Sequence, residues 1–421
     1  MADLLVLTGN CQAQYLAAVL DGLAGAQAIY YGVGYGTVPS FEGRLSWSLY
    51  GARFRGVVKE ARARGDRIML IEQRTPVADP PDLKLDPAFT VAFPHLICYA
   101  LYPAEFCRDH GLPTAPNPRR LWSLDLNNMA KGQERSAFTI DIAGYCEEHF
   151  RKEVLFNTPG HPTGPLNALL VHGVLVQLAS FDPRYGGSDL AERVRRHEGV
   201  NWVTSHPVAP DVEEKLDLDW GKSYHDFCRL IRACWTEQAL GDEIPVLIAR
   251  VEQTYAQDSI YWFWAAAIWW QRRNSEAAIQ ASRIGLGLSP GHGQYWLGLQ
   301  TRLLQSGFGL QAESLLDEVR RVFGNRFEAD AVLATLYNNL GRYHEALPLA
   351  INHFYNYGYN PEPLQPIAHA LTELGRFDEI HNYARMTMAH YPGKTGQVEQ
   401  ILAPYAERVS SFEAVQARAV S

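Results

Sequence analysis

The stretch Leu340-Gly341-Arg342-Tyr343-His344-Glu345-Ala346 returns along the chain at a fixed spacing, and this spacing decides the fold of the C-terminal part. Gly341 lies 34 residues after Gly307 and 34 residues before Gly375, and Arg273 stands one period upstream. Five residues after each of these four positions comes a small or aliphatic residue: Ala278, Ala312, Ala346 and Ile380. A fixed period of this length indicates stacked structural repeats.

The repeated residues have the properties that a pair of antiparallel helices requires. Glycine suits the positive φ of the tight turn between two helices. A small residue one turn into the second helix lets the first helix pack closely, and a later Pro or Gly ends the second helix. These terminating residues are Pro290, Gly324, Gly358 and Pro392.

The segments Leu340 to Ala346 and Leu374-Gly375-Arg376-Phe377 resemble the tetratricopeptide repeat. The resemblance covers about residues 257 to 392, with a capping helix pair expected over 223–256 and a closing helix over 395–408. It implies an all-α solenoid that binds a protein partner or a second copy of the chain. The aromatic residues Tyr261 to Trp264, with Trp269 and Trp270, form either a binding groove or platform for a peptide or sugar, or a filled seam against the N-terminal domain and the next repeat.

Length and composition place limits on the rest of the molecule. A chain of 421 residues predicts at least two domains. A net charge of -8 argues against nucleic acid as the main partner. The apolar stretches predict no membrane span, and the N-terminus lacks the basic region of a signal peptide. Six cysteines without a C-x-x-C pair predict reduced thiols and a cytoplasmic protein.

The N-terminal half alternates between strand-like and helix-like segments. Leu4 to Leu7 is a continuous apolar run that predicts a buried parallel strand, followed by a turn and a helix over 13–23. We expect further strands at 67–72, 89–93 and 154–157, and helices at 49–64 and 166–178. The alternation predicts a mainly parallel sheet covered on both faces, whose functional crevice lies at the carboxyl ends of the strands.

Cys11 lies where the first strand leads into the first helix. A helix N-terminus stabilises negative charge, so we expect it to lower the pKa of the Cys11 thiol. Free N–H groups there can bind an oxyanion, and Gly9 permits a substrate to approach the backbone. The alternative is a small buried cysteine in a tight turn.

His161 follows a predicted strand in the segment Thr158-Pro159-Gly160-His161-Pro162. A histidine on a rigid loop is a candidate general base, and with Cys11 it would form a nucleophile–base dyad. The alternative is that His161 only hydrogen-bonds its own loop. His95 and His206 are the competing candidates for the base.

Four ordered motifs carry a resemblance to a known family. They are Gly9-Asn10-Cys11-Gln12, Ile71-Glu72-Gln73, Phe93-Pro94-His95-Leu96 with Tyr102-Pro103, and Thr158 to Pro162. Together, over about residues 3 to 210, they resemble the WcbI-type acetyltransferases of capsular polysaccharide biosynthesis. That resemblance implies an acyl-coenzyme A donor such as acetyl-CoA, a sugar acceptor, and a fold and Cys–His site related to SGNH-type esterases.

The resemblance also implies roles for individual residues. Cys11 would be the nucleophile and His161 the base, while Gly9, Asn10, Gln12 and Gln73 would orient the substrate or its oxyanion. Coenzyme A needs cations for its phosphates, and the alternative for each cation is a solvated surface position. These candidate cations are Arg74, Arg119, Arg120 and Lys131. No metal is expected, because no cluster with metal-ligand spacing appears.

The sequence therefore predicts an α/β catalytic domain over 1–210, a linker with capping helices over 211–256, and tetratricopeptide-like repeats over 257–408. Three functions remain open. The first is acyl transfer from acyl-coenzyme A to a surface polysaccharide, the second is an SGNH-like carbohydrate esterase, and the third is a non-enzymatic scaffold.

Overall fold

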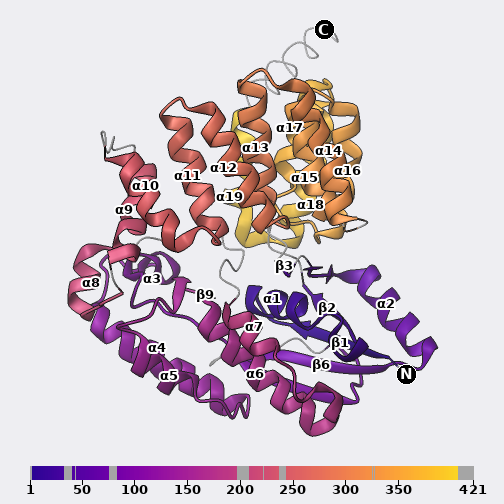
Figure 1. Ribbon diagram of the computed structural model, residues 1–421. Coiled ribbons are helices and arrows are strands. Elements are labelled where there is room, and N and C mark those ends of the chain that lie inside the picture. Colours follow the sequence, from indigo (N-terminus) through magenta and orange to yellow (C-terminus); the bar gives the residue numbers. More distant parts are fainter. Residues whose placement is uncertain are drawn as a thin grey trace. The chain divides into compact units, whose positions relative to one another are not determined.

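The computed structural model describes residues 2–32, 40–42, 44–74, 83–196, 208–220, 222–236, 243–324, 326 and 328–405. The chain forms two compact units (Figure 1). Unit 1 comprises Met1–Leu49 and Phe54–His292, and unit 2 comprises Tyr50–Arg53 and Gly293–Ser421. The two units are described separately below.

Unit 1 is built on a five-stranded sheet in which all neighbouring strands run parallel. The strand order is β5 (Ser48–Leu49), β2 (Gln27–Tyr31), β1 (Asp3–Thr8), β6 (Arg67–Arg74) and β7 (Phe89–Pro94). The predicted strands at 4–7, 67–72 and 89–93 are confirmed as β1, β6 and β7. The sequence pattern did not predict β2 and β5, which are short strands next to helical segments in the sequence.

Helices cover both faces of this sheet, as the alternating pattern predicts (Figure 1). Leu5 and Leu7 of β1 share a core with α1 (Cys11–Leu20) and α6 (Gly164–Phe181). On the other face, Leu4 and Val6 share a core with the side chains of α2 (Gly51–Arg64). Both sets are buried, which explains why β1 reads as an unbroken apolar run and not as an alternating one.

The remaining helices before residue 220 are four short ones and α4, which has 18 residues. A backbone hydrogen bond of 2.7 Å from Cys98 to Pro159 ties the loop after β7 to the segment before α6. These helices are α3 (Pro103–His110), α4 (Pro118–Arg135), α5 (Ile142–His149), α7 (Leu190–Arg196) and α8 (Pro210–Leu216), with 3₁₀ turns at Leu23–Gly25 and Pro183–Tyr185.

A side chain of α6 bonds the backbone of the outer strand β7 at one residue. The Gln177 amide nitrogen donates to the Ala92 carbonyl at 2.8 Å, and the Ala92 N–H donates to the Gln177 amide oxygen at 3.3 Å. At Ala92, the edge strand β7 thus bonds a side chain in place of a further strand. Among the described residues, α6 alone has the length and hydropathy of a membrane-crossing helix, and 56% of that stretch is buried inside the protein.

The strand expected at 154–157 does not join the parallel sheet, so that prediction is wrong. Residues Phe156–Thr158 form β8, which pairs antiparallel with β9 (His161–Pro162) around a Pro159-Gly160 turn. A two-residue loop brings the chain straight back, and a parallel strand would need a much longer crossover connection. His161 therefore lies on a hairpin and not at a strand end of the main sheet.

Four helices of the predicted capping and repeat region belong to unit 1. They are α9 (Lys222–Thr236), α10 (Ile244–Tyr255), α11 (Ser259–Gln271) and α12 (Ser275–Leu288). Ile260, Tyr261 and Trp264 of α11 lie in the same hydrophobic cluster as the sheet residues Leu5 and Leu7. Tyr261 and Trp264 are thus core residues, while Trp262 and Phe263 are only half-buried, and α11 packs mainly against α12 and α9. The compact units divide after His292, within the range predicted for the repeats.

Unit 2 continues the helix pairs that the 34-residue period predicts. Its turns carry Gly307, Gly341 and Gly375 at φ values of 79°, 72° and 70°, and Arg273 at the same phase in unit 1 has a φ of 59°. Ala312 and Ala346 are fully buried one turn later. The helices of unit 2 are α13 (Gly293–Gln305), α14 (Gly309–Phe323), α15 (Glu328–Asn339), α16 (Tyr343–Asn356), α17 (Leu364–Glu373), α18 (Phe377–His390) and α19 (Thr395–Leu402), with 3₁₀ turns at Pro392–Lys394 and Ala403–Tyr405.

Candidate functional site

The strand order of unit 1 contains one point where the connections reverse direction. From β1 the chain passes through α1 to β2 on one side, and it later returns through α2 to β6 on the other side of β1. In open parallel sheets, ligands bind at the carboxyl ends of the strands beside such a switch point. Here those ends carry Gly9 to Cys11 after β1 and Gln73 in β6.

Gln12 is the centre of a hydrogen-bonded cluster at this edge. Its amide nitrogen donates to the carbonyl oxygens of Leu96 at 2.6 Å and Gly160 at 2.9 Å. Its amide oxygen accepts from Gln73 Nε2 at 2.9 Å and from the Leu96 N–H at 3.2 Å. Gln12 is 1% exposed and uses its full bonding capacity within the protein. It therefore positions the surrounding segments and has no donor left for a substrate.

Gln73 holds the turn after β1 in place. Its amide oxygen accepts from the Asn10 N–H at 2.9 Å, and Asn10 Oδ1 in turn accepts from the Gln12 N–H at 2.9 Å as the N-cap of α1. Gly9 has a φ of 144°, and a Cβ there would lie 2.6 Å from Gln73 Cβ. The Tyr30 hydroxyl donates to the Gly9 carbonyl at 2.8 Å. Glycine is thus required at position 9 by both the backbone angle and the approach of Gln73.

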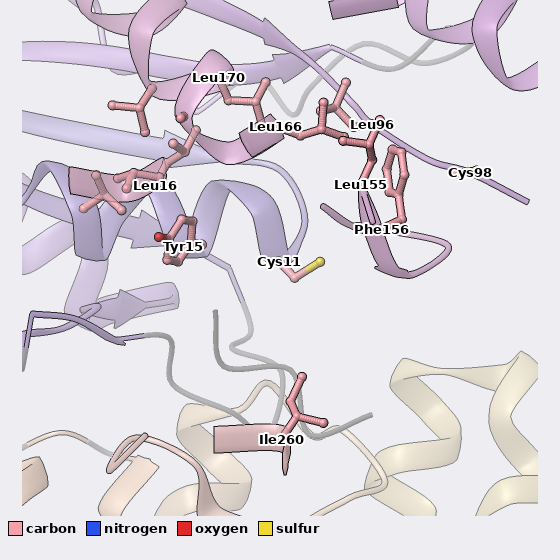
Figure 2. Close-up of a cluster of buried hydrophobic side chains, with 14 of the residues drawn as sticks. Cys11, Tyr15, Leu16, Leu96, Cys98, Leu155, Phe156, Leu166, Leu170 and Ile260 are labelled. Atoms are coloured by element: carbon pink, nitrogen blue, oxygen red, sulfur yellow. The ribbon is translucent and has the colours of Figure 1, made fainter. Parts of the chain in front are cut away.

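Cys11 is the first residue of α1, as predicted, but its environment differs from the prediction. The thiol is 9% exposed, and burial raises its pKa to about 12, although the backbone N–H groups of Gln12 and Cys11 oppose this shift. The expectation of a lowered pKa is wrong, because the loss of solvent outweighs the helix N-terminus. In Figure 2 the sulfur points from the start of α1 toward the hairpin that carries Phe156.

The β8–β9 hairpin is fixed from two directions. The Pro159 carbonyl accepts from the Cys98 N–H at 2.7 Å, and the Gly160 carbonyl accepts from Gln12. His161 is half-buried, and its Nδ1 shares a hydrogen bond with the hydroxyl of Thr158. Gln12, which follows Cys11, thus contacts Gly160, which precedes His161. This contact brings Cys11 and His161 to the same edge of the sheet.

His95, a competing candidate for the base, lies directly after β7. Burial lowers the pKa of its imidazole to about 4, so the ring is neutral at physiological pH. Its Nε2 atom is buried without a hydrogen-bond partner among the residues that the structure describes. The third candidate, His206, lies outside the described residues.

The candidate cations do not converge on one point. Arg74 pairs with the buried carboxylate of Glu72, and Arg119 Nε donates to the Lys215 carbonyl at 2.6 Å. Arg120 and Lys131 are exposed on one face of α4, about 16 Å apart by the rise of the helix. Lys131 adjoins Gly132, whose Cβ would lie 3.3 Å from Pro94 Cβ at the end of β7. Arg74, the last residue of β6, lies at the carboxyl edge itself, and Lys131 is anchored beside that edge through Gly132.

Two contributors to this site were not identified from the sequence. Thr158 contacts the imidazole of His161, and the backbone of Leu96 holds Gln12 through both its polar groups. The Thr158 contact spans a two-residue turn and could have been suspected from the Thr-Pro-Gly-His order. The Leu96 contact could not, because a backbone group has no signature in the sequence. The described residues contain no group of three or more His, Cys, Asp or Glu side chains that could hold a metal ion.

Among known proteins, only solved structures are similar to this chain. No family model and no curated protein matches the chain. Similar solved structures include the tetratricopeptide protein TTC0263 of Thermus thermophilus, with 18% identity, a TM-score of 0.31, and 43% of this chain and 97% of that chain covered. The MamA protein matches at 13% identity and a TM-score of 0.28, over 41% of this chain and 95% of its own. YrrB, described as a tetratricopeptide protein with an unusual peptide-binding site, matches at 15% identity and a TM-score of 0.25, over 39% of this chain and 88% of its own.

Proposed function

We propose that unit 1 transfers an acyl group, most simply acetyl, from an acyl-coenzyme A to a sugar hydroxyl of a surface polysaccharide. Cys11 is the nucleophile and His161 the general base. The observation that carries the proposal is the hydrogen bond from Gln12 to the Gly160 carbonyl, since it joins the neighbours of these two residues at the switch point of a parallel sheet.

The reaction proceeds in two balanced steps. The Cys11 thiol gives its proton to the imidazole as sulfur attacks the thioester carbonyl, and the tetrahedral intermediate expels the coenzyme A sulfur, which takes that proton. A sugar hydroxyl then attacks the acyl-cysteine and loses its proton to the imidazole. Collapse of this second intermediate releases the O-acyl sugar, and the Cys11 sulfur recovers the proton.

The burial of Cys11 favours a mechanism in which the thiol is protonated until the moment of attack. With a pKa raised to about 12, the thiolate is scarce at neutral pH, so the proton must be removed within the step. Once formed, negative charge at this position is stabilised by the N-terminus of α1. The Asn10 side-chain nitrogen, which has no partner among the described residues, is the donor available to a developing oxyanion.

The donor phosphates require cations at the rim of the site. Lys131 supports this role best, because it is exposed and α4 packs against the end of β7 beside it. Arg74 is the weaker choice, because Glu72 already neutralises its charge. Lys131→Ala should therefore weaken coenzyme A binding more than Arg120→Ala. Arg120 is also exposed, but it lies near the other end of α4, farther from β7.

The test is to incubate the full chain with acetyl-coenzyme A and measure acyl-enzyme by intact mass and peptide mapping. We expect acylation of Cys11, absent in Cys11→Ala and strongly slowed in His161→Ala, with Cys107→Ala and His172→Ala as controls. Coenzyme A binding is followed by calorimetry. The proposal would be overturned if Cys11 stays unmodified and coenzyme A does not bind. If the protein then hydrolyses a simple aryl ester without coenzyme A, that result would indicate an SGNH-like esterase.

A second candidate is a ligand-binding scaffold without catalysis. The observation that favours it is the internal use of the Gln12 amide together with the high pKa of the Cys11 thiol. In that case the helix pairs recruit a protein partner, and unit 1 binds a ligand without changing it. Coenzyme A binding that produces neither acyl-cysteine nor ester hydrolysis would favour the scaffold.

A further inference from the structure

The hydroxyl of Thr158 is placed to control which nitrogen of His161 carries the proton. Thr158 is the last residue of β8 and pairs with His161 across the hairpin. Its side chain is 5% exposed, and its Oγ1 shares a hydrogen bond with His161 Nδ1. Because both carbonyls of the intervening turn are held by Cys98 and Gln12, the hairpin cannot easily shift to break this contact.

We propose that Thr158 is a positioning residue that accepts the Nδ1–H of His161 and so keeps Nε2 as the basic nitrogen. This inference rests on the proposed role of His161 as general base. A base must present a lone pair to the thiol, and the group bonded to the other nitrogen decides the tautomer. If the hydroxyl donated to Nδ1 instead, the proton would sit on Nε2 and the ring could not accept one from the Cys11 thiol there.

The two arrangements differ in their effect on the basicity of the ring. A hydroxyl oxygen that accepts from Nδ1–H favours the charged imidazolium, so its removal lowers the pKa of His161. A hydroxyl that donates to Nδ1 bonds only the neutral ring, so its removal raises the pKa. Thr158→Val keeps the shape of the side chain and removes the hydroxyl, and the sign of the pKa change therefore identifies the donor.

The experiment measures the ring directly in the full-length protein. Imidazole ¹⁵N shifts of His161 are recorded against pH in the wild type, in Thr158→Val and in Thr158→Ser. Thr163→Val serves as a matched control, because Thr163 directly follows the hairpin and its hydroxyl donates to the Val154 carbonyl at 2.8 Å, away from the imidazole. We expect the Nδ1–H tautomer in the wild type and a pKa lower by about half a unit in Thr158→Val. The serine variant should keep both wild-type properties.

An Nε2–H tautomer in the wild type, or a pKa that rises or stays unchanged in Thr158→Val, would overturn the inference. Should the valine variant fail to fold, the tautomer in the wild type and in Thr158→Ser still decides. The NMR result does not depend on turnover, so it remains valid if acyl transfer is never observed. Where turnover is found, Thr158→Val should lower kcat about tenfold and move the pH profile in the same direction as the NMR pKa.

Discussion

Gln12 and Gly160 are 148 residues apart in the chain and are joined by a hydrogen bond of 2.9 Å from side-chain amide to main-chain carbonyl. The same amide also binds both polar groups of the Leu96 backbone. One side chain thereby fixes the start of α1, the loop after β7 and the β8–β9 hairpin relative to one another. The candidate site depends on this buried amide for its shape.

Gln12→Ala should lower the stability of unit 1 by about 2 to 4 kcal/mol. The substitution leaves the polar groups of Leu96, Gly160 and Gln73 buried without their partner. Denaturant unfolding followed by circular dichroism measures the loss. Gln305→Ala, at an exposed position of α13, is the control and should change stability by less than about 0.5 kcal/mol. Equal effects of the two substitutions would contradict the central role of Gln12.

Gly9→Ala should disrupt the site far more than Gly160→Ala. An added Cβ at position 9 meets Gln73 Cβ at 2.6 Å, and the φ of 144° is strained for any L side chain. At position 160 an added Cβ meets no atom within 4 Å. We expect a loss of about 3 kcal/mol or more for Gly9→Ala and less than about 0.5 kcal/mol for Gly160→Ala. Comparable melting temperatures for both variants would show that Gln73 can move aside.

Cys11 should react slowly with iodoacetamide in the folded protein. Burial limits access to the sulfur and raises the pKa of the thiol to about 12, so little thiolate is present below about pH 9. Cys107 on α3 is only half-buried and provides the internal comparison. Peptide mapping after timed alkylation should find Cys107 modified before Cys11. Preferential labelling of Cys11 at neutral pH would mean that the helix N-terminus outweighs burial after all.

Because of the titration of Asp125, the stability of unit 1 should decrease as the pH rises from about 4 to about 7. Its carboxyl group is 1% exposed and accepts from the Ala100 N–H at 2.8 Å, and burial raises its pKa to about 7 from the ordinary 3.8. Between these two values the folded protein holds a proton that the unfolded chain releases, so stability falls with increasing pH. The upper limit is about 4 kcal/mol, at about 1.4 kcal/mol per pKa unit.

The variant Asp125→Asn removes this titration and keeps the acceptor for Ala100. The free energy of unfolding of the variant, relative to the wild type, should therefore increase from about pH 5 to about pH 8. Asp86→Asn, at an exposed position, provides the control for the chemical substitution itself. His95 contributes the opposite slope in both proteins between about pH 4 and its ordinary pKa of 6.5, because burial lowers its pKa, and this contribution cancels in the comparison.

The turn glycines of the repeats should respond to substitution according to φ alone. Gly341 has a φ of 72°, and an added Cβ there would meet no atom within 4 Å, so Gly341→Ala should cost about 1 kcal/mol through backbone strain. Gly309 begins α14 without a positive φ, and Gly309→Ala should stabilise by up to about 0.5 kcal/mol through helix propensity. Thermal unfolding of the full chain measures both, and changes of the same sign would argue against this account of the turns.

The local elements were predictable where a short segment contains its own determinants. The period of Gly307, Gly341 and Gly375 marked the turns, and the apolar run from Leu4 to Leu7 marked the first strand. The segment before His161 was misassigned, because an apolar run of this length fits a parallel strand and a hairpin arm equally well. Only the turn at Pro159-Gly160 and the partner across it decided between them.

The sequence by itself determined the stacked helix pairs, the parallel sheet and the position of Cys11 at the start of a helix. These features follow from spacing, side-chain size and backbone freedom, which act over a few residues. Only the tertiary structure decided the protonation of Cys11, the internal bonding of Gln12, the contact between Thr158 and His161, and the burial of Tyr261 and Trp264 in α11. Burial and hydrogen bonding between distant segments depend on which surfaces meet in the folded chain, and a linear pattern does not contain that information.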